Sequence, residues 1–450
     1  MKDFTLAEIA KACNGEYVGD ESLKNTKITS VERDSRQVKN GSLFLAIKGE
    51  RVDGHDFIEK CFAQGAVCAL CEKAPENATK PCIVVSSTLD AVKKIGRAYR
   101  EKFDIPVIGI SGSVGKTSTK EMLYAVLSQK FKTHKTQGNL NNELGVPLTL
   151  LSTPEDTEAA VIEMGISDFG EMTRLSEMVQ PTICVLTIIG ECHLENLGDR
   201  DGVLKAKTEM FKNARENADF ILNGDDDKLS TVKSVNGKKP VFFGLDAKND
   251  FYAKNIKNSG DGKVLATLCF DNNNIDVEIP AIGTYMVTNA LAAAAAGKLL
   301  GLTNEEIANG VASYKTVGSR ANVINTGKIK IIDDCYNANP TSVRASLDTL
   351  SNLDGRKVAI LGDMKELGSE ELKLHFDTGV YAKSKDIGTV ITVGKLAKEL
   401  AKGADGKAFD TIEDAKPEIL KTIKSGDVVL VKASHSMQFE NIVEFLKQNF

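Results

Sequence analysis

Residues Val107 to Ser118 read VIGISGSVGKTS and form the most informative motif of the sequence. An apolar run, Val107 to Ile110, enters a glycine-rich turn that ends in Lys-Thr, and a helix is expected from about Thr119 to Gln129. Glycines allow backbone N–H groups to close around phosphate oxygens, and the helix N-terminus adds the positive end of its dipole. Strand, turn and helix in this order predict a binding site for ATP or GTP.

Within this turn, we expect Lys116 to reach the β- and γ-phosphates and the hydroxyl of Thr117 or Ser118 to bind Mg²⁺. The spacing departs from the usual GxxxxGK[ST], because Ile110 occupies the position of the first glycine. A chance glycine-rich turn is the alternative, but it does not explain the flanking strand and helix. The residues expected to bind the nucleotide here are Gly112, Ser113, Val114, Gly115, Lys116, Thr117 and Ser118.

Outward from the turn, apolar runs alternate with segments of helical length, which is typical of a mostly parallel sheet covered by helices. The alanine-rich segment Ala290 to Leu300 is predicted to be one of the helices. The predicted strands are Val107 to Ile110, Ala159 to Ile162, Ile183 to Ile188 and Phe220 to Leu222.

Two further α/β units flank this middle one. Pro106 follows a helical stretch ending near Arg100 and marks a boundary. Short apolar runs before it predict a small mixed α/β domain, and a new strand–helix series after Arg320 predicts a Rossmann-like third domain. We therefore predict an α/β chain with domains at 1–103, 104–317 and 318–450, in line with roughly 150 residues per domain for 450 residues. The flanking strands are predicted at Leu43 to Ile47, Val67 to Leu70, Cys82 to Val85, Ile329 to Ile332, Val358 to Leu361, Val390 to Val393 and Val428 to Val431.

Composition excludes several classes of protein. The 57 Lys and Arg against 62 Asp and Glu give a net charge of −5, which argues against a nucleic-acid-binding role. No apolar run approaches the ~20 residues of a membrane span, and the N-terminus lacks a secretory pattern. Nine cysteines are an odd number for a disulfide framework, and Cys68 and Cys71 have no second pair to complete a zinc site. We expect a cytoplasmic monomer that is not embedded in a membrane.

Two polar residues follow predicted strands of the middle domain. Glu163 ends one strand and His193 follows the next, at the sheet edge where ligands of open α/β sheets collect. Both side chains suit a divalent cation, although His193 taken alone is more often a loop histidine. The segment from Thr136 to Pro147 contains Asn139, Asn141 and Asn142 and is suited to an anionic ligand, although such clusters alone are usually turns.

These motifs together resemble the Mur ligases, the ATP-dependent amide-forming enzymes of peptidoglycan assembly, which share a core with folylpolyglutamate synthetase. The short GxxGK[ST][ST] loop of that family is similar to Gly112 to Ser118, and its TxxNxNNxxGxP loop to Thr136 to Pro147. Its strand-end glutamate resembles Glu163, and its DHL/AHLE motif resembles Cys192 to Glu195.

The resemblance implies further site residues. Lys207, in the segment Ala206 to Phe211, matches a family lysine that CO₂ converts to a carbamate, which would help to hold Mg²⁺. Asn289 is similar to the asparagine near the adenine, Arg320 to the arginine that contacts phosphate, and Asp334 to the aspartate that contacts the nucleotide. The implied catalytic residues are Lys116, Glu163, His193 and Lys207, and the implied metal ligands are Thr117, Ser118, Glu163, His193 and carbamylated Lys207.

Other segments indicate the branch of the family. Ser30 to Arg36, Gly41 to Ala46 and Asp53 to His55 look like its UDP-binding first domain. The segments DDCYNANP (333–340) and LGDMKELG (361–368) look like the branch that adds D-alanyl-D-alanine. Cys335 stands where serine is usual, and KASH (432–435) replaces a KGS[RH]-like segment. The implied substrate residues are Ser30, Asp34, Ser35, Arg36, Asn139, Asn141 and Asn142, with Asn337 and His435 as candidates for the dipeptide pocket.

The implied reaction joins D-alanyl-D-alanine to a UDP-N-acetylmuramoyl tripeptide through an acyl phosphate, with ATP and Mg²⁺, and supplies the pentapeptide for cell-wall synthesis. One alternative is the branch that adds a diamino acid, although its DNPR segment is absent. Folylpolyglutamate synthetase is disfavoured because it lacks the UDP-type first domain. A non-catalytic nucleotide-binding scaffold would not need Glu163, His193 and Lys207. Whether the third stem-peptide residue is lysine or diaminopimelate stays open.

Overall fold

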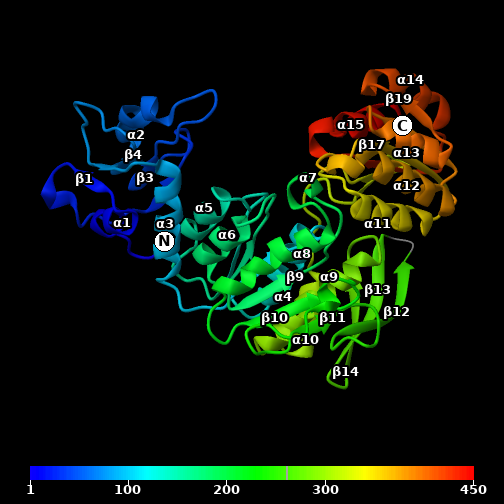
Figure 1. The fold of residues 1–450 in the computed structure, drawn as a ribbon, viewed down its shortest axis with the longest axis horizontal. Helices are drawn as coiled ribbons and strands as arrows, with labels where there is room; N and C mark the ends of the chain where they lie inside the picture. The colour runs from blue at the N-terminus through cyan, green and yellow to red at the C-terminus, as the bar shows by residue number, and fades with distance from the viewer. Residues whose placement is uncertain (260–261) are drawn as a thin grey trace.

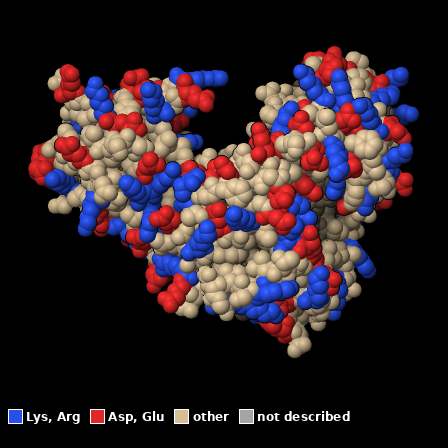
Figure 2. Space-filling model, viewed as in Figure 1, with Lys and Arg blue, Asp and Glu red and all other residues tan. Residues whose placement is uncertain are grey.

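The structure, a computed structural model, describes residues 1–259 and 262–450 as three α/β units in a row (Figure 1). The N-terminal unit in blue and the C-terminal unit in orange and red stand on either side, and the middle unit in green lies between and below them. Figure 2 shows a hollow between the two outer units and an even mixture of acidic and basic side chains on this face. The α/β class predicted from the sequence is confirmed. The residue limits of the three domains stay a prediction.

The middle unit is built on a six-stranded sheet, ordered β11-β10-β9-β6-β8-β7, in which all pairs are parallel. Strand β9 ends at Leu186 and not at Ile188, because Ile188 leaves the sheet and accepts a hydrogen bond from Ser113 N at 2.8 Å. The strands are β6 (Val107–Ser111), β7 (Thr133–Lys135), β8 (Ala159–Glu163), β9 (Ile183–Leu186), β10 (Asp219–Asn223) and β11 (Val241–Phe243). The carboxyl ends of β6, β8 and β9 therefore lie side by side.

Helices cover both faces of this sheet. Helix α4 (Lys116–Leu127) begins one turn earlier than predicted, because Gly115 in a left-handed conformation is its N-cap. Helix α9 (Tyr285–Leu299) packs against α4, and its alanines are fully buried, so that the two backbones approach closely. The other helices of the unit are α5 (Gly145–Leu151), α6 (Glu171–Val179), α7 (Leu194–Leu197), α8 (Arg200–Thr208) and α10 (Asn304–Ala312).

The sequence did not predict a second, antiparallel sheet in the middle unit. Its strands are β12 (Tyr252–Ser259), β13 (Lys263–Phe270) and β14 (Asn273–Ile279), in that order. Their apolar side chains join α4 and α9 in one hydrophobic core. The antiparallel sheet therefore packs on the side of the middle unit where α4 and α9 lie, and it completes the hydrophobic core there.

The outer units each carry one mixed sheet, and in both the single antiparallel pair is at an edge. In the N-terminal unit the order is β1-β5-β4-β3-β2, with β1 (Glu16–Val18), β2 (Ser30–Glu32), β3 (Ser42–Leu45), β4 (Cys68–Cys71), β5 (Cys82–Val84), α1 (Leu6–Cys13), α2 (Ile58–Gln64) and α3 (Thr88–Arg100). In the C-terminal unit it is β15-β16-β20-β17-β18-β19, with β15 (Asn322–Asn325), β16 (Lys330–Asp333), β17 (Arg356–Gly362), β18 (Thr389–Val393), β19 (Lys407–Phe409), β20 (Asp427–Lys432), α11 (Pro340–Ser351), α12 (Glu371–Ser384), α13 (Ala397–Ala404), α14 (Ile412–Thr422) and α15 (Glu440–Asn449).

Two expectations from composition can be compared with the structure. All nine cysteines are free and buried, and Cys68 and Cys71 lie on the buried strand β4, as expected of small hydrophobic residues. Across residues 1–259 and 262–450, none of the helices has the length and apolar character that crossing a membrane requires.

Candidate active site

The glycine-rich turn between β6 and α4 has a backbone that only glycine adopts readily. Gly112 has φ +149° and Gly115 has φ +85°. A Cβ on Gly112 would lie 1.9 Å from Thr187 Oγ1, which itself donates a hydrogen bond to the Val114 carbonyl at 2.6 Å. Lys116 Nζ donates to the Gly112 carbonyl at 2.8 Å, so the lysine is folded back over the turn. Contacts with the residues that follow β9 thus fix the conformation of the turn.

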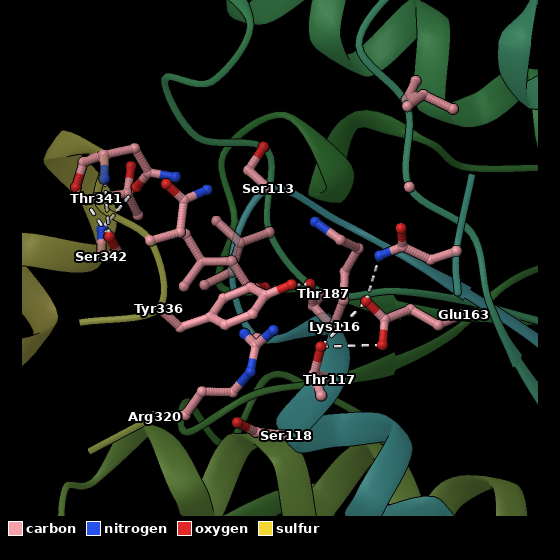
Figure 3. A pocket seen from close by; sticks show the side chains of 18 of the residues that line it. Ser113, Lys116, Thr117, Ser118, Glu163, Thr187, Arg320, Tyr336, Thr341 and Ser342 are labelled. Atoms are coloured by element: carbon pink, nitrogen blue, oxygen red, sulfur yellow. Dashed lines mark hydrogen bonds between the residues drawn. The ribbon is translucent and has the colours of Figure 1, made fainter. Parts of the chain in front are cut away.

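Glu163, at the end of β8, is the point where three sequence motifs meet. The carboxylate is buried and accepts hydrogen bonds from Thr117 Oγ1 at 2.9 Å and from Asn141 Nδ2 at 2.8 Å. Its backbone N–H donates to Thr136 Oγ1 at 2.9 Å. Figure 3 shows Thr117 and Lys116 beside this carboxylate. The phosphate loop, the asparagine-containing loop and the strand-end glutamate therefore form one polar cluster.

Lys120 belongs to this cluster and was missed in the sequence. Its side chain is 0% exposed, and Nζ lies 3.5 Å from Glu163 Oε2 and 3.2 Å from Glu121 Oε1. Glu121 is also paired with Lys135. The available signal was the spacing: Lys116 and Lys120 are four residues apart on α4 and therefore share a face of the helix.

Lys207 is a buried lysine without a counter-charge. It is 1% exposed, and within the described ranges its amine has no hydrogen bond or ion pair. Burial is the main cause that lowers its pKa to about 8; Cys192 opposes the shift and the neighbouring Lys116 contributes to it. An amine with such a pKa is partly neutral near neutral pH, which gives it nucleophilic character.

His193 follows β9 and contacts the C-terminal unit. Its Nδ1 lies 2.6 Å from Glu366 Oε2, and the hydrogen bond from His193 lowers the pKa of the Glu366 carboxyl. A second contact nearby is the hydrogen bond from Thr341 Oγ1 to Glu191 Oε2 at 2.6 Å. The loop that contains His193 is therefore bounded by both units.

The C-terminal unit presents a charged cluster to the phosphate loop. The Arg320 guanidinium lies 3.7 Å above the centre of the Tyr336 ring, and Figure 3 shows both residues facing Lys116 and Thr117. Lys432 Nζ is 2.6 Å from Asp334 Oδ2 and donates to the Asn337 carbonyl at 2.9 Å. Lys432 is buried, and the sequence analysis assigned it no role.

A cavity of about 840 Å³ lies between the middle and C-terminal units, reaches Leu89 and Lys93 on α3 of the N-terminal unit, and joins these groups. Asn289 lies on its wall, where its Oδ1 accepts a hydrogen bond from Thr119 at 3.0 Å. Lys207 and Gly112 are adjacent to the site but do not line the cavity. The predicted residues that do line it are Ser113, Val114, Gly115, Lys116, Thr117, Ser118, Asn141, Asn142, Glu163, His193, Asn289, Arg320, Asp334 and Asn337.

The predicted substrate residues of the N-terminal unit do not line this cavity. Ser30 Oγ is hydrogen-bonded to Ser42 Oγ at 2.9 Å on the first sheet. Asp34 pairs with the exposed Arg36 at 2.7 Å, and this contact lowers the pKa of Asp34 to about 2. Ser35, between them, also lies outside the cavity, so these four residues form a separate polar surface.

Of three other predicted substrate residues, Asn142 lines the cavity, whereas Asn139 and His435 do not. Asn142 lines the cavity, but its Oδ1 accepts the backbone N–H of Gly145 at 2.8 Å and so supports the start of α5. Asn139 is exposed beside it. His435 lies outside the cavity, is 73% exposed and stacks on Tyr336 with 5.7 Å between ring centres.

Comparison with known proteins covers all three units. Residues 27–111 match the family model "Mur ligase family, catalytic domain", residues 110–297 match "Mur ligase middle domain", and residues 319–435 match "Mur ligase, glutamate ligase domain". The chain is 37% identical, over 98% of each chain, to a Bacillus subtilis protein named UDP-N-acetylmuramoyl-tripeptide–D-alanyl-D-alanine ligase.

Two solved structures are also similar. A crystal structure of MurF from Acinetobacter baumannii has a TM-score of 0.92 and 32% identity, covering 100% of this chain and 99% of that one. A crystal structure of the MurF ligase from Thermotoga maritima in complex with ADP has a TM-score of 0.84 and 30% identity, covering 93% and 97%. The similarity thus extends from the sequence motifs to the arrangement of the whole chain.

Proposed function

The chain belongs to the Mur ligase family, and from this premise we propose that it joins D-alanyl-D-alanine to a UDP-N-acetylmuramoyl tripeptide while ATP becomes ADP and phosphate. The observation that carries the proposal is the similarity, over nearly the full length of both chains, to a relative named for this reaction. The cavity supports it, because the phosphate loop and the charged cluster of the C-terminal unit face the same space.

The chemistry follows from the poor reactivity of a carboxylate. An oxygen of the tripeptide carboxylate attacks the γ-phosphorus of ATP, ADP leaves, and an acyl phosphate forms. The dipeptide amine attacks the acyl carbon, the bond to the phosphate oxygen breaks, and the amine loses a proton as the amide forms. Phosphoryl transfer needs positioning and charge neutralisation more than covalent help from the protein. Lys116 and Arg320 supply the positive charge at the two sides of the cavity.

The side chains near the phosphate loop fit Mg²⁺. The hydroxyls of Thr117 and Ser118 and the carboxylate of Glu163 are hard oxygen ligands, and His193 lines the same cavity. When bound, Mg²⁺ would neutralise negative charge on the phosphate oxygens. Within residues 1–259 and 262–450, no group of three or more His, Cys, Asp and Glu side chains is arranged to hold a metal ion. We assign a further anionic ligand to Lys207 as a carbamate, since its neutral amine can react with CO₂.

The long substrate accounts for the two separate groups of substrate residues. Ser30, Asp34, Ser35 and Arg36 would bind the UDP end on the N-terminal unit, across the hollow that Figure 2 shows. The asparagine loop (Asn139, Asn141, Asn142) would meet the peptide, and Asn337 and His435 the dipeptide. Asn289 and Asp334 would contact the nucleotide. The buried free cysteines support a reducing compartment, for which we propose the cytoplasm.

The test is phosphate release from ATP and Mg²⁺ with a UDP-N-acetylmuramoyl tripeptide, with and without D-alanyl-D-alanine. We expect release that requires both substrates, with a pentapeptide product confirmed by mass. Lys116→Ala is the control, and it should reduce turnover below about a tenth of wild type because phosphate positioning is lost.

Other outcomes identify other functions. Release that depends on a muramoyl dipeptide and a diamino acid would move the chain to the diamino-acid-adding branch. ADP binding without phosphate release in either assay would favour a nucleotide-binding scaffold. The same assay with tripeptides that end in lysine or in diaminopimelate determines the third residue.

A further inference from the structure

The C-terminal unit docks on the loop that carries His193. Glu366, in the segment after β17, has Oε2 2.6 Å from His193 Nδ1. Thr341, at the start of α11, donates a hydrogen bond to Glu191 at 2.6 Å. Helix α7 packs against the 3-10 turn Gly368–Glu370, and Figure 1 shows α7 beside the C-terminal unit. The position of the His193 side chain therefore depends on a unit that is distant in sequence.

Both members of this pair have an unusual backbone. His193 has φ +53° and Glu366 has φ +65°, a left-handed backbone conformation that residues other than glycine rarely adopt. Such conformations persist only where the surroundings hold them, and they are concentrated at functional sites. His193 is the N-cap residue of α7, but its side chain makes no capping hydrogen bond. Its ring is therefore oriented by Glu366 and not by the helix that follows.

The pairing leaves one ring nitrogen of His193 available. Because Nδ1 faces Glu366 Oε2 at 2.6 Å, Nε2 is the ring nitrogen left for another partner, and the described chain offers Nε2 no hydrogen bond. His193 lines the cavity together with Thr117 and Glu163. Metal-binding histidines commonly have a carboxylate on the second nitrogen, which fixes the ring and increases its basicity.

We propose that Glu366 is a positioning residue that presents His193 Nε2 to the divalent cation, so that metal binding in the middle unit and docking of the C-terminal unit favour each other. This rests on the proposed role of His193 as a metal ligand. Because coupling between two equilibria is reciprocal, a cation bound near Glu163 and His193 stabilises the docked arrangement. The reacting groups of both units are then brought together when the metal is present.

The direct test is Mn²⁺ binding to the full chain, measured by electron paramagnetic resonance. Bicarbonate is present, and nucleotide is left out so that its phosphates do not bind the ion. Glu366→Ala is expected to weaken Mn²⁺ binding tenfold or more. Glu366→Gln keeps an acceptor oxygen and should show a smaller loss. Glu413→Ala, which removes an exposed carboxylate of α14 paired with Lys416 at 2.5 Å, is the matched control and should bind within twofold of wild type. ADP affinity without divalent ions should be the same in all four proteins, which verifies folding.

His193→Ala separates the possible explanations. We expect it to weaken Mn²⁺ binding, and Glu366→Ala to add no further loss in that background. If His193→Ala binds Mn²⁺ normally, the metal role of His193 and the role of Glu366 are both wrong. If His193→Ala weakens binding but Glu366→Ala does not, only the role of Glu366 is wrong. An equal loss from Glu366→Ala with and without His193 would mean that Glu366 acts through docking alone, which also overturns the proposal.

Discussion

Lys120 and Lys207, two buried lysines of the middle unit, differ in chemical role because their surroundings differ. Lys120 lies between Glu163 and Glu121 at 3.5 and 3.2 Å, whereas Lys207 has neither an ion pair nor a hydrogen bond within the described residues. A buried charge with partners stabilises the cluster that it belongs to, and a buried charge without partners tends to neutralise. Lys120 is therefore expected to serve as a structural cation and Lys207 as a reactive amine.

For Lys207 we predict an activity that depends on CO₂ and on pH. Carbamate forms from the neutral amine, whose fraction increases as pH rises through the pKa of about 8. At fixed, limiting dissolved CO₂, turnover should therefore increase from pH 7 to pH 9, and ¹³C-labelled bicarbonate should give a carbamate resonance by NMR. Lys207→Ala should lose most activity and the resonance, and the exposed neighbour Lys205→Ala should keep both. Normal turnover of Lys207→Ala would contradict the carbamate hypothesis.

For Lys120 we predict a large loss of stability. Lys120→Met leaves Glu163 and Glu121 buried with one cation fewer, and breaking a buried pair costs about 3 kcal/mol or more. For a domain of this size that lowers the unfolding temperature by roughly 6 to 12 °C, measured by differential scanning calorimetry. Lys132→Met breaks an exposed ion pair with Asp156 and should shift the transition much less. Equal shifts in the two variants would show that Lys120 is not a structural cation.

Among the elements, the turn between β6 and α4 depends on its neighbour β9. The two residues that follow β9 are Thr187, whose hydroxyl donates to the Val114 carbonyl, and Ile188, whose carbonyl accepts the N–H of Ser113. Parallel pairing of β6 with β9 brings these groups to the turn. The phosphate loop is therefore a property of two strands and not of one motif.

Gly112→Ala tests this dependence. The added Cβ would lie 1.9 Å from Thr187 Oγ1 and would require φ +149°, so the turn must open. We expect ADP affinity, measured by isothermal titration calorimetry, to fall at least tenfold. Gly237→Ala has a positive φ of +80° but nothing within 4 Å of the new Cβ, and it should leave ADP affinity unchanged. If the two variants bind ADP equally well, the contact with β9 does not shape the loop.

For the whole molecule, the nucleotide site is shared between units. The phosphate loop lies on the middle unit, and Arg320 and Asp334 approach from the C-terminal unit across one cavity. A ligand that binds only the native arrangement stabilises it by about 2.7 kcal/mol at a concentration of 100 times Kd. Nucleotide binding is therefore expected to stabilise both units together.

Hydrogen exchange measures this coupling. With Mg²⁺ and ADP, we expect slower exchange in residues 112–118 and in residues 334–346, because both segments contribute to the wall of the cavity. Residues 30–45 of the N-terminal unit should be unaffected. The Lys116→Ala variant at the same ADP concentration is the control without bound nucleotide. Protection confined to the middle unit would contradict a shared site.

Much of the architecture was predictable from the sequence because it depends on local pattern. Apolar runs separated by helical segments predicted β6, β8, β9 and β10 to within about two residues. The antiparallel strands β12 to β14 were missed. Strand β14 does alternate, with Ile275, Val277 and Ile279 buried, so this signal was overlooked, whereas β12 exposes several lysine and asparagine side chains and gives no such pattern. Their place in the fold comes from packing against α4 and α9.

The α/β class and the position of the phosphate loop in the chain follow from local sequence, because glycine conformation, strand periodicity and helix capping act over a few neighbouring residues. The pairs Lys120–Glu163 and His193–Glu366 could be identified only from the folded chain, because each joins residues far apart in the sequence. The sequence contains both Lys120 and Lys207 in helical segments that look alike. Packing places one beside two carboxylates and buries the other without a counter-charge among the described residues, and the cost of burying a charge gives them different chemistry.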